Sequence, residues 1–200
     1  MKILFQGAEA RALETVFFGE ECVLKKREHK AYREKALDAR IISERTRQEC
    51  QLLSKAKSAG VRVPAIVFVD KKKGEIFLER IGGKTAKELP AKGLEKTCAL
   101  IGKNVALLHD AGIIHGDLTT ANIVMEKTGL VFLDFGLGFF SDKTEDRATD
   151  LLVLKKTLAA RHHEAKNAWK KTTESYITNS LKGRQVIEHI TEIEKRARYS

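Results

Sequence analysis

The stretch HGDLTTAN at residues 115–122, followed by DFG at residues 134–136, carries the strongest signal in this sequence of 200 residues. Asp117 can accept the proton of a hydroxyl group, and the side-chain oxygens of Asn122 and Asp134 are of the kind that binds Mg²⁺. Two short apolar segments between them, 123–125 and 130–133, are typical of a small hairpin. A hairpin there would return Asp134 to Asn122, so the spacing predicts one site rather than three isolated turn residues.

Helices are expected on both sides of this stretch. Before it, apolar residues recur at steps of four, three, four and three, which predicts an amphipathic helix that stops at Gly112. These residues are Leu94, Cys98, Ile101, Val105 and Leu108. After it, three more helices are expected over 150–160, 164–181 and 184–198.

The first part of the chain favours strands around a single helix. β-favouring residues separated by glycine turns predict antiparallel strands over 3–10, 12–19 and 21–27, and the segments 65–70 and 75–80 flank a hairpin turn. Helical spacing runs over 39–59, with Ile42, Leu53 and Ala56 on one stripe. Gly82-Gly83 is the expected hinge, so we predict one domain at 1–81 and a second, mainly helical domain at 82–200.

Composition limits the class of protein. The hydrophobic fraction of 42% can build a core, and no apolar run approaches the roughly 20 residues of a membrane-spanning helix. The start of the sequence has too short an apolar core for a signal peptide, so we expect a cytoplasmic protein. Cys22, Cys50 and Cys98 lack metal-ligand spacing and are expected to be reduced core thiols. The net charge of +10 indicates a polyanionic partner such as RNA or an acidic protein surface.

The order and spacing of the HGD, Asn and DFG elements resemble those of the eukaryotic-type protein kinase superfamily. The resemblance implies an α+β, bilobal protein kinase-like fold, with a β-rich N-lobe at 1–81 and a reduced, mainly helical C-lobe at 82–200. It implies that Asp117 is the catalytic base and that Asn122 and Asp134 hold magnesium. It also implies that Lys25, on the third strand, contacts the ATP phosphates and pairs with Glu49, which shares the inward stripe of the first helix.

Other positions are expected near the nucleotide. The resemblance implies that Gly7 and Glu9, in the first strand turn, lie near the phosphates, although this turn has one glycine where a kinase loop usually has three. It also implies that Glu79 and Ile81, ahead of the hinge, help to bind the nucleotide. Asp150 is expected to support the catalytic loop by hydrogen bonding.

The combined motifs resemble the small atypical Ser/Thr kinases of the KEOPS (EKC) complex, the PRPK family. This resemblance covers the whole chain and implies ATP and magnesium as cofactors. It implies a kinase or ATPase that works beside a threonylcarbamoyl transferase subunit and other KEOPS subunits, supporting threonylcarbamoyladenosine modification of tRNA. The implied contact with tRNA or a partner is the basic C-terminal end, namely Lys195, Arg196 and Arg198.

Two other functions remain open at this point. A small-molecule kinase of the choline or aminoglycoside type also carries an HGD-like motif with a downstream Asn, but it normally needs extra C-terminal helices. A scaffold or tRNA-binding subunit with a weak kinase site is the other alternative. The sequence does not distinguish water, the chain itself or a partner protein as the phosphate acceptor.

Overall fold

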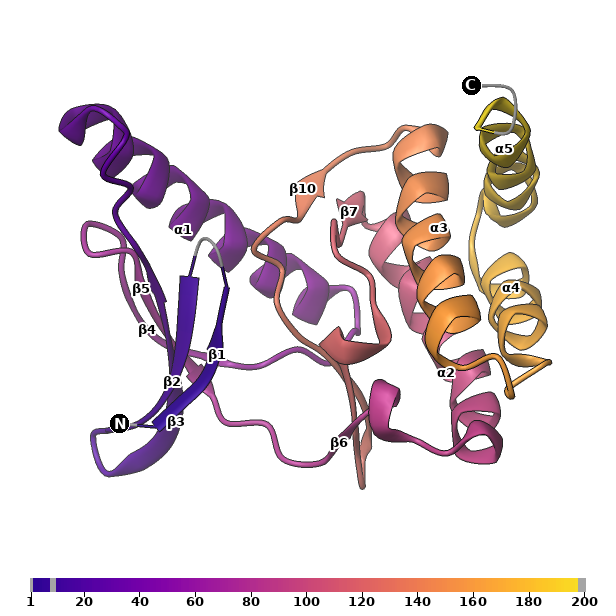
Figure 1. The fold of residues 1–200 in the computed structure, drawn as a ribbon, viewed down its shortest axis with the longest axis horizontal. Coiled ribbons are helices and arrows are strands. Elements are labelled where there is room, and N and C mark those ends of the chain that lie inside the picture. Colours follow the sequence, from indigo (N-terminus) through magenta and orange to yellow (C-terminus); the bar gives the residue numbers. More distant parts are fainter. Residues whose placement is uncertain (1, 8–9, 198–200) are drawn as a thin grey trace. The chain divides into compact units, whose positions relative to one another are not determined.

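A computed structural model describes residues 2–7 and 10–197 (Figure 1). The chain forms two compact units, one made of residues 1–54 and 64–81 and the other of residues 55–63 and 82–200. Each unit has its own hydrophobic core. Among the described residues, no helix is long and apolar enough to cross a membrane.

The first unit is an antiparallel sheet with one long helix. The strands are β1 (Lys2–Gln6), β2 (Ala10–Phe17), β3 (Glu20–Arg27), β4 (Ile66–Asp70) and β5 (Glu75–Glu79), and the helix is α1 (Lys35–Ser58). They lie in the order β1-β2-β3-β5-β4, with all neighbours antiparallel. The three predicted strands and the predicted hairpin are therefore confirmed.

Helix α1 crosses one face of this sheet (Figure 1). Its residue Ile42 packs against the β3 and β5 ends, since a Cβ added to Gly74 would lie 2.5 Å from Ile42 Cγ2 and 3.2 Å from Arg27 Cβ. Ile42 and Leu53 are buried, as the stripe predicted. The helix begins at Lys35, four residues earlier than expected, because the Glu34 carboxylate accepts the N–H groups of its first turn.

Aromatic rings cover part of the sheet in the first unit. Phe17, Phe68 and Phe77 contact one another with ring centroids 4.4 to 5.9 Å apart. The turn between β2 and β3 consists of Phe18 and Gly19, with φ of 49° and 84°. Positive φ at both central residues is the geometry that a two-residue hairpin loop favours.

The second unit begins with small strands and a helix. It contains β6 (Lys84–Thr85), the 3₁₀ turn η1 (Ala86–Glu88), α2 (Ala91–Asp110), β7 (Ile113–Ile114), η2 (Thr120–Asn122), β8 (Ile123–Glu126), β9 (Gly129–Phe132) and β10 (Phe139–Phe140). The strands β6, β8 and β9 form one antiparallel sheet, and β7 pairs with β10. The predicted hairpin between Asn122 and Asp134 is confirmed as β8 and β9.

Helices complete the second unit: α3 (Thr144–Arg161), α4 (Ala168–Asn179) and α5 (Gly183–Arg196). The apolar stripe of α2 is confirmed, since all five of its predicted members are at most 1% exposed. At Gly102 the α2 backbone lies so close to α4 that an added Cβ would be 2.2 Å from the Thr172 carbonyl oxygen. Helix α3 begins six residues before the predicted position 150, so little chain separates it from the DFG stretch.

Candidate active site

The loop after β7 carries Asp117, and its backbone is held by a buried carboxylate. Asp150, on α3, accepts hydrogen bonds from the N–H groups of His115 at 2.9 Å and Gly116 at 3.0 Å. Burial alone would raise the pKa of Asp150, but the hydrogen bond and charge of His109 and the bond from the His115 N–H hold this pKa below its usual value. Asp150 is therefore ionised at neutral pH and supports the loop, as predicted.

His115 connects the loop to the DFG stretch. Its Nε2 donates to the Leu133 carbonyl at 2.9 Å, and its Nδ1 accepts from the Asp117 N–H at 3.3 Å. These partners require the neutral ring with its proton on Nε2. The ring also packs against Phe135, with centroids 4.6 Å apart. His115 thus orients Asp117 through the backbone.

The residue between His115 and Asp117 has to be glycine. Gly116 has φ of 79°, and an added Cβ would lie 2.2 Å from the Leu137 carbonyl oxygen. A side chain at this position would push the catalytic loop away from the segment that follows DFG. Close backbone contact therefore keeps these two segments together.

Asp117, Asn122 and Asp134, which the sequence predicted to carry the chemistry, lie on neighbouring segments of the second unit. Asn122 Nδ2 donates to Asp117 Oδ2 at 2.8 Å and to the Asp117 carbonyl at 2.9 Å. The carbonyl of Asn122 accepts the N–H of Leu133 at 2.8 Å, and Asp134 is the next residue. Asp134 is exposed, has φ of 55° and accepts the Gly136 N–H. An amide oxygen and an exposed carboxylate in this arrangement are suitable ligands for magnesium.

The first unit carries the predicted ion pair. Lys25 Nζ lies 2.5 Å from Glu49 Oε1, and the Glu49 side chain is 2% exposed. This pairing is confirmed, while a contact of Lys25 with ATP stays a prediction. Glu49 also binds Arg27, a contact that no sequence pattern predicted.

The remaining predicted nucleotide residues are only partly described. Gly7 lies between β1 and β2 and donates its N–H to the Ala10 carbonyl at 3.0 Å. Glu79, at the end of β5, accepts the Ala65 N–H at 3.0 Å. Ile81 follows β5 and is half-buried. Their roles in nucleotide binding stay predictions, and Glu9 lies outside the described residues.

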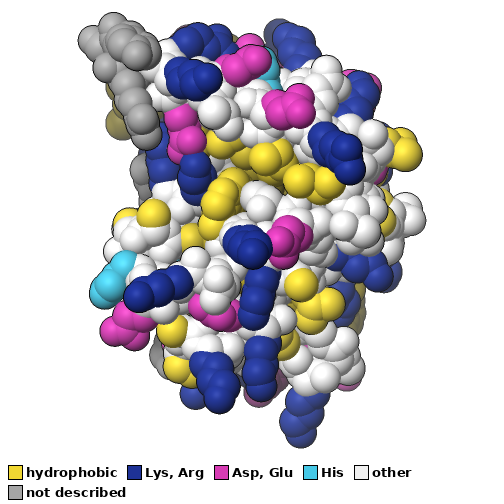
Figure 2. All heavy atoms as spheres, turned by 90° about the vertical axis from the view of Figure 1, so that its right-hand side faces the viewer, with side chains coloured by type: hydrophobic (Ala, Val, Ile, Leu, Met, Phe, Trp, Pro, Cys, Tyr) yellow, Lys and Arg dark blue, Asp and Glu magenta, His cyan; other side chains and the backbone are white. Residues whose placement is uncertain are grey.

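The C-terminal helices form a basic face. Lys and Arg side chains are spread over this face around an apolar area (Figure 2). Lys195 and Arg196 lie in the last turn of α5, both exposed, and Arg196 Nη2 is 3.6 Å from Glu145. Arg198 lies outside the described residues. Other exposed cations from this part of the chain are Lys166, Lys170, Lys182 and Arg184.

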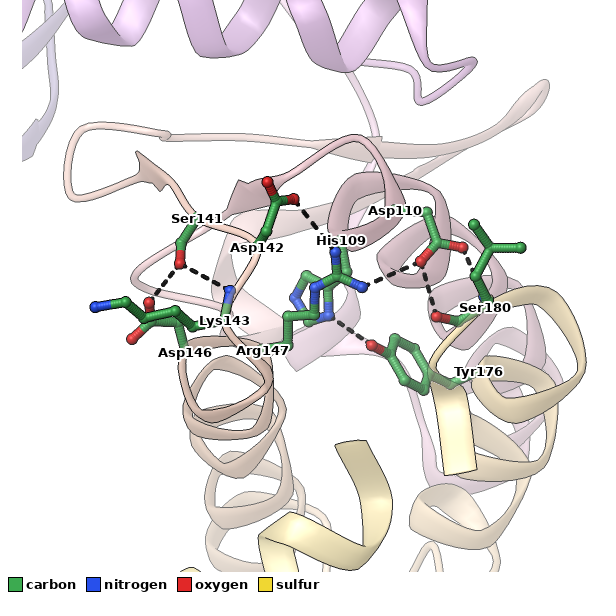
Figure 3. Close-up of polar contacts among 10 residues, drawn as sticks. His109, Asp110, Ser141, Asp142, Lys143, Asp146, Arg147, Tyr176 and Ser180 are labelled. Carbon is green, nitrogen blue, oxygen red and sulfur yellow. Dashed lines mark hydrogen bonds and ion pairs between the residues drawn. The ribbon is translucent and has the colours of Figure 1, made fainter. Parts of the chain in front are cut away.

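Two residues at the end of α2 link α3 to α4 and the segment that follows it. His109 lies 2.8 Å from the Tyr176 hydroxyl through Nδ1 (Figure 3). Its Nε2 lies 3.2 Å from Asp150. Asp110 accepts Arg147 Nη1 at 3.3 Å and Ser180 Oγ at 3.0 Å. No sequence pattern indicated these contacts, which join residues 37 to 70 positions apart.

Comparison with known proteins identifies the family. A family described as RIO domain matches residues 14–152. The KEOPS complex subunit Bud32 of Pyrococcus abyssi is 36% identical over 212 residues, which cover 100% of this chain and 96% of that protein. The chain belongs to the Bud32 family of RIO-domain proteins. A second Bud32-family relative, the EKC/KEOPS complex subunit bud32 of Dictyostelium discoideum, is 34% identical and covers 98% of this chain and 82% of its own length.

Longer relatives and solved structures extend this result. The probable bifunctional tRNA threonylcarbamoyladenosine biosynthesis protein of Methanothermobacter thermautotrophicus is 40% identical over 99% of this chain, which spans only 36% of that relative. The Rio2 kinase of Chaetomium thermophilum, solved with ADP/Mg²⁺ and phosphoaspartate, aligns with a TM-score of 0.64 at 15% identity, covering 98% of this chain and 72% of Rio2. This Bud32-family chain therefore has the predicted α+β, protein kinase-like fold.

Proposed function

We propose that this chain is the Mg-ATP-dependent kinase or ATPase subunit of a KEOPS complex and supports threonylcarbamoyladenosine modification of tRNA. Two relatives that match nearly the whole chain are named as KEOPS subunits, and the longer relatives are named for threonylcarbamoyladenosine biosynthesis. The observation that carries the chemistry is the hydrogen bond from Asn122 to Asp117 in a loop that Asp150 supports.

Each side chain has a role that follows from its contacts. Because Asn122 Nδ2 donates to Asp117 Oδ2, the Oδ1 atom of Asp117 is left to accept the proton of an attacking O–H group. The same contact turns the Asn122 amide nitrogen toward Asp117, so its Oδ1 and the Asp134 carboxylate are the oxygens that would hold magnesium. Lys25, fixed by Glu49, would bind phosphate oxygens. Bound Mg-ATP would supply the transferable phosphoryl group and offset the charge on its oxygens.

We infer that water is the main acceptor. Helix α3 begins at Thr144, only ten positions after Asp134, which leaves no room for a long activation segment that could dock a peptide. A hydrolytic role needs nothing more of Asp117 than to orient one O–H group. Transfer to a Ser or Thr hydroxyl of the chain itself is then a side reaction at the same site.

We further propose that the basic C-terminal face contacts tRNA or a partner protein of the complex. The exposed cations there, Lys195 and Arg196 among them, would bind phosphate groups and release counterions. This contact predicts that tRNA binding weakens steeply as salt rises, independently of ATP.

The test is to follow released phosphate and protein-bound phosphate together, with Mg-ATP, before and after adding the transferase subunit. Asp134→Ala should abolish phosphate release, and Asp142→Ala should leave it unchanged, because Asp142 is 89% exposed and lies outside the site. Hydroxylamine treatment of the labelled protein separates an aspartyl phosphate, as named in the Rio2 structure, from a Ser or Thr phosphate.

The outcomes separate the candidate functions. Phosphate release that depends on Asp134 and changes with the transferase subunit supports the ATPase role. A partner protein labelled faster than free phosphate appears would contradict water as the acceptor. An absence of turnover in every condition, with tRNA binding intact, would favour a scaffold subunit instead.

A further inference from the structure

The ion pair in the first unit has a third member. Glu49 Oε1 contacts Lys25 Nζ at 2.5 Å, and Glu49 Oε2 accepts a hydrogen bond from Arg27 Nη2 at 2.6 Å. The side chains of Lys25, Arg27 and Glu49 are 12%, 5% and 2% exposed. One carboxylate is therefore shared between two cations, with one oxygen for each.

Strand geometry explains why both cations reach the same helix residue. Lys25 and Arg27 are two positions apart on β3, so their side chains leave the same face of the sheet. Lys26, between them, lies on the other face and pairs with Glu75 at 2.8 Å. Glu49 meets both cations because α1 crosses the face that Lys25 and Arg27 share.

Arg27 is held more firmly than an ordinary strand residue. Its N–H donates to the Gly74 carbonyl at 2.9 Å, and Gly74 is close to both Arg27 and Ile42 of α1, since a Cβ added to Gly74 would lie 3.2 Å from Arg27 Cβ and 2.5 Å from Ile42 Cγ2. Ile42 is seven residues before Glu49, two turns earlier on the helix. Gly74 thus connects the Arg27 backbone to α1 at one turn, and Glu49 binds the Arg27 side chain at another.

Charge balance gives the arrangement a consequence. Lys25, Arg27 and Glu49 together carry a formal charge of +1 in a largely buried place, where excess charge is costly unless an anion is nearby. With Oε2 held by Arg27, Glu49 meets Lys25 through Oε1 alone. A Lys ammonium is a cation of the kind that binds phosphate oxygens, so its position beside Glu49 bears on nucleotide binding.

We propose that Arg27 is a positioning residue for nucleotide binding: it keeps α1 on the sheet without nucleotide and restricts Lys25 to one oxygen of Glu49. This inference rests on the proposed function, because it takes Lys25 to be the phosphate-binding lysine. Because Arg27 holds α1 in place, Glu49 stays beside Lys25 even when Lys25 turns to a ligand. A kinase site built this way needs no displacement of α1 to become active.

Four variants test the proposal. Arg27→Met removes the cation and keeps most of the apolar volume, and Arg27→Lys restores a cation at the same position. Lys25→Met removes the other cation, and Lys26→Met is the matched control on the opposite face of β3. Hydrogen exchange of the α1 segment, residues 42–53, is measured without nucleotide, and phosphate release gives KM for ATP and kcat.

The expected results distinguish positioning from general stability. Losing a buried hydrogen bond to a charged group changes an equilibrium constant by roughly tenfold or more. Arg27→Met should therefore speed hydrogen exchange in α1 and raise KM for ATP by about tenfold, with kcat per folded molecule nearly unchanged. Arg27→Lys should recover most of the KM. Lys25→Met should leave exchange in α1 close to the wild-type rate, and Lys26→Met should change neither quantity.

Three results would overturn the proposal in separable ways. Unchanged exchange in Arg27→Met, with faster exchange in Lys25→Met, would show that Lys25 and not Arg27 holds α1. An unchanged KM, with kcat lowered in proportion to the folded fraction, would reduce Arg27 to a stabilising residue. If ATP binding to the wild-type chain did not depend on Lys25, the proposed function and the nucleotide role of Arg27 would both be refuted. Hydrogen exchange in α1 would then test only whether Arg27 anchors the helix.

Discussion

Replacing Asp150 by Asn should destabilise the second unit and disable the catalytic loop. The Asp150 carboxylate accepts hydrogen bonds from the His115 and Gly116 N–H groups and contacts His109 Nε2. An Asn side chain has one acceptor oxygen, so its amide group must face at least one of these donors. The Asp150→Asn variant therefore keeps the shape of the residue and removes part of its hydrogen bonding.

The size of the effect follows from burial. The Asp150 side chain is 1% exposed, so water cannot replace the lost contacts. A hydrogen bond to a charged group contributes about 1.5 to 3 kcal/mol. The Asn amide group would also face an N–H donor, which adds to the loss, so we expect a decrease of about 3 kcal/mol in the free energy of unfolding. For a chain of this size, that corresponds to a decrease in Tm of about 6 to 12 °C.

The pH dependence has a definite sign. The pKa of Asp150 is lower in the folded protein than in the unfolded chain, where it is about 3.9. The contribution of Asp150 to stability is therefore complete above its pKa in the unfolded chain and is lost as pH falls through its pKa in the folded protein. The stability gap between wild type and Asp150→Asn should be present at neutral pH and should close as pH falls below about 4.

Urea unfolding followed by Trp169 fluorescence measures this gap. Trp169 is the single tryptophan and lies on α4, in the same unit as Asp150, so the signal reports the unit that carries the change. Asp142→Asn is the control, because that residue is 89% exposed, and it should cost less than about 0.5 kcal/mol. A gap below about 1 kcal/mol at pH 7, or full ATP turnover in Asp150→Asn, would refute the reasoning.

Three further outcomes are expected. Gly116→Ala should abolish phosphate release from a folded protein, because its Cβ would meet the Leu137 carbonyl at 2.2 Å; wild-type turnover would contradict the close contact. Tyr176→Phe should lower the urea stability by about 1 kcal/mol by removing the hydroxyl that bonds His109, and an unchanged midpoint would argue against that bond. Burial, and then the charge of Glu49, raise the pKa of Cys50 to about 11, so a disulfide reagent at pH 8 should react at least about tenfold more slowly than with an ordinary thiol; a normal rate would contradict this burial.

Periodicity predicted the helices, and it placed the start too late in the two helices whose first turns are polar. Helix α2 was predicted well because its apolar spacing is regular, and all of that stripe is buried. Helix α3 begins at Thr144 because its polar first turn has Glu145 and Asp146 near the positive end of the helix dipole, a signal that apolar spacing does not contain. Helix α1 begins early because Glu34 binds its first N–H groups.

The site was predictable where neighbours in the sequence carry the chemistry. Asp117, Asn122 and Asp134 lie on segments that one hairpin brings together, so their spacing was informative. Arg27 was missed because its role depends on which face of β3 the helix covers, and one sequence does not contain that information. His109 was missed for a similar reason, since its partner Tyr176 is 67 positions away.

The contacts of His109 and Asp110 bear on where a shortened version of this protein could end. The RIO-domain match stops at residue 152, inside α3. Tyr176 and Ser180, which contact these two residues, lie well beyond that point. A polypeptide trimmed to the matched region would leave His109 without its phenolic partner and the α2 surface at Gly102 without α4. The boundary of the RIO-domain match is thus not the boundary of the folding unit, and gene fusions should keep the chain through α5.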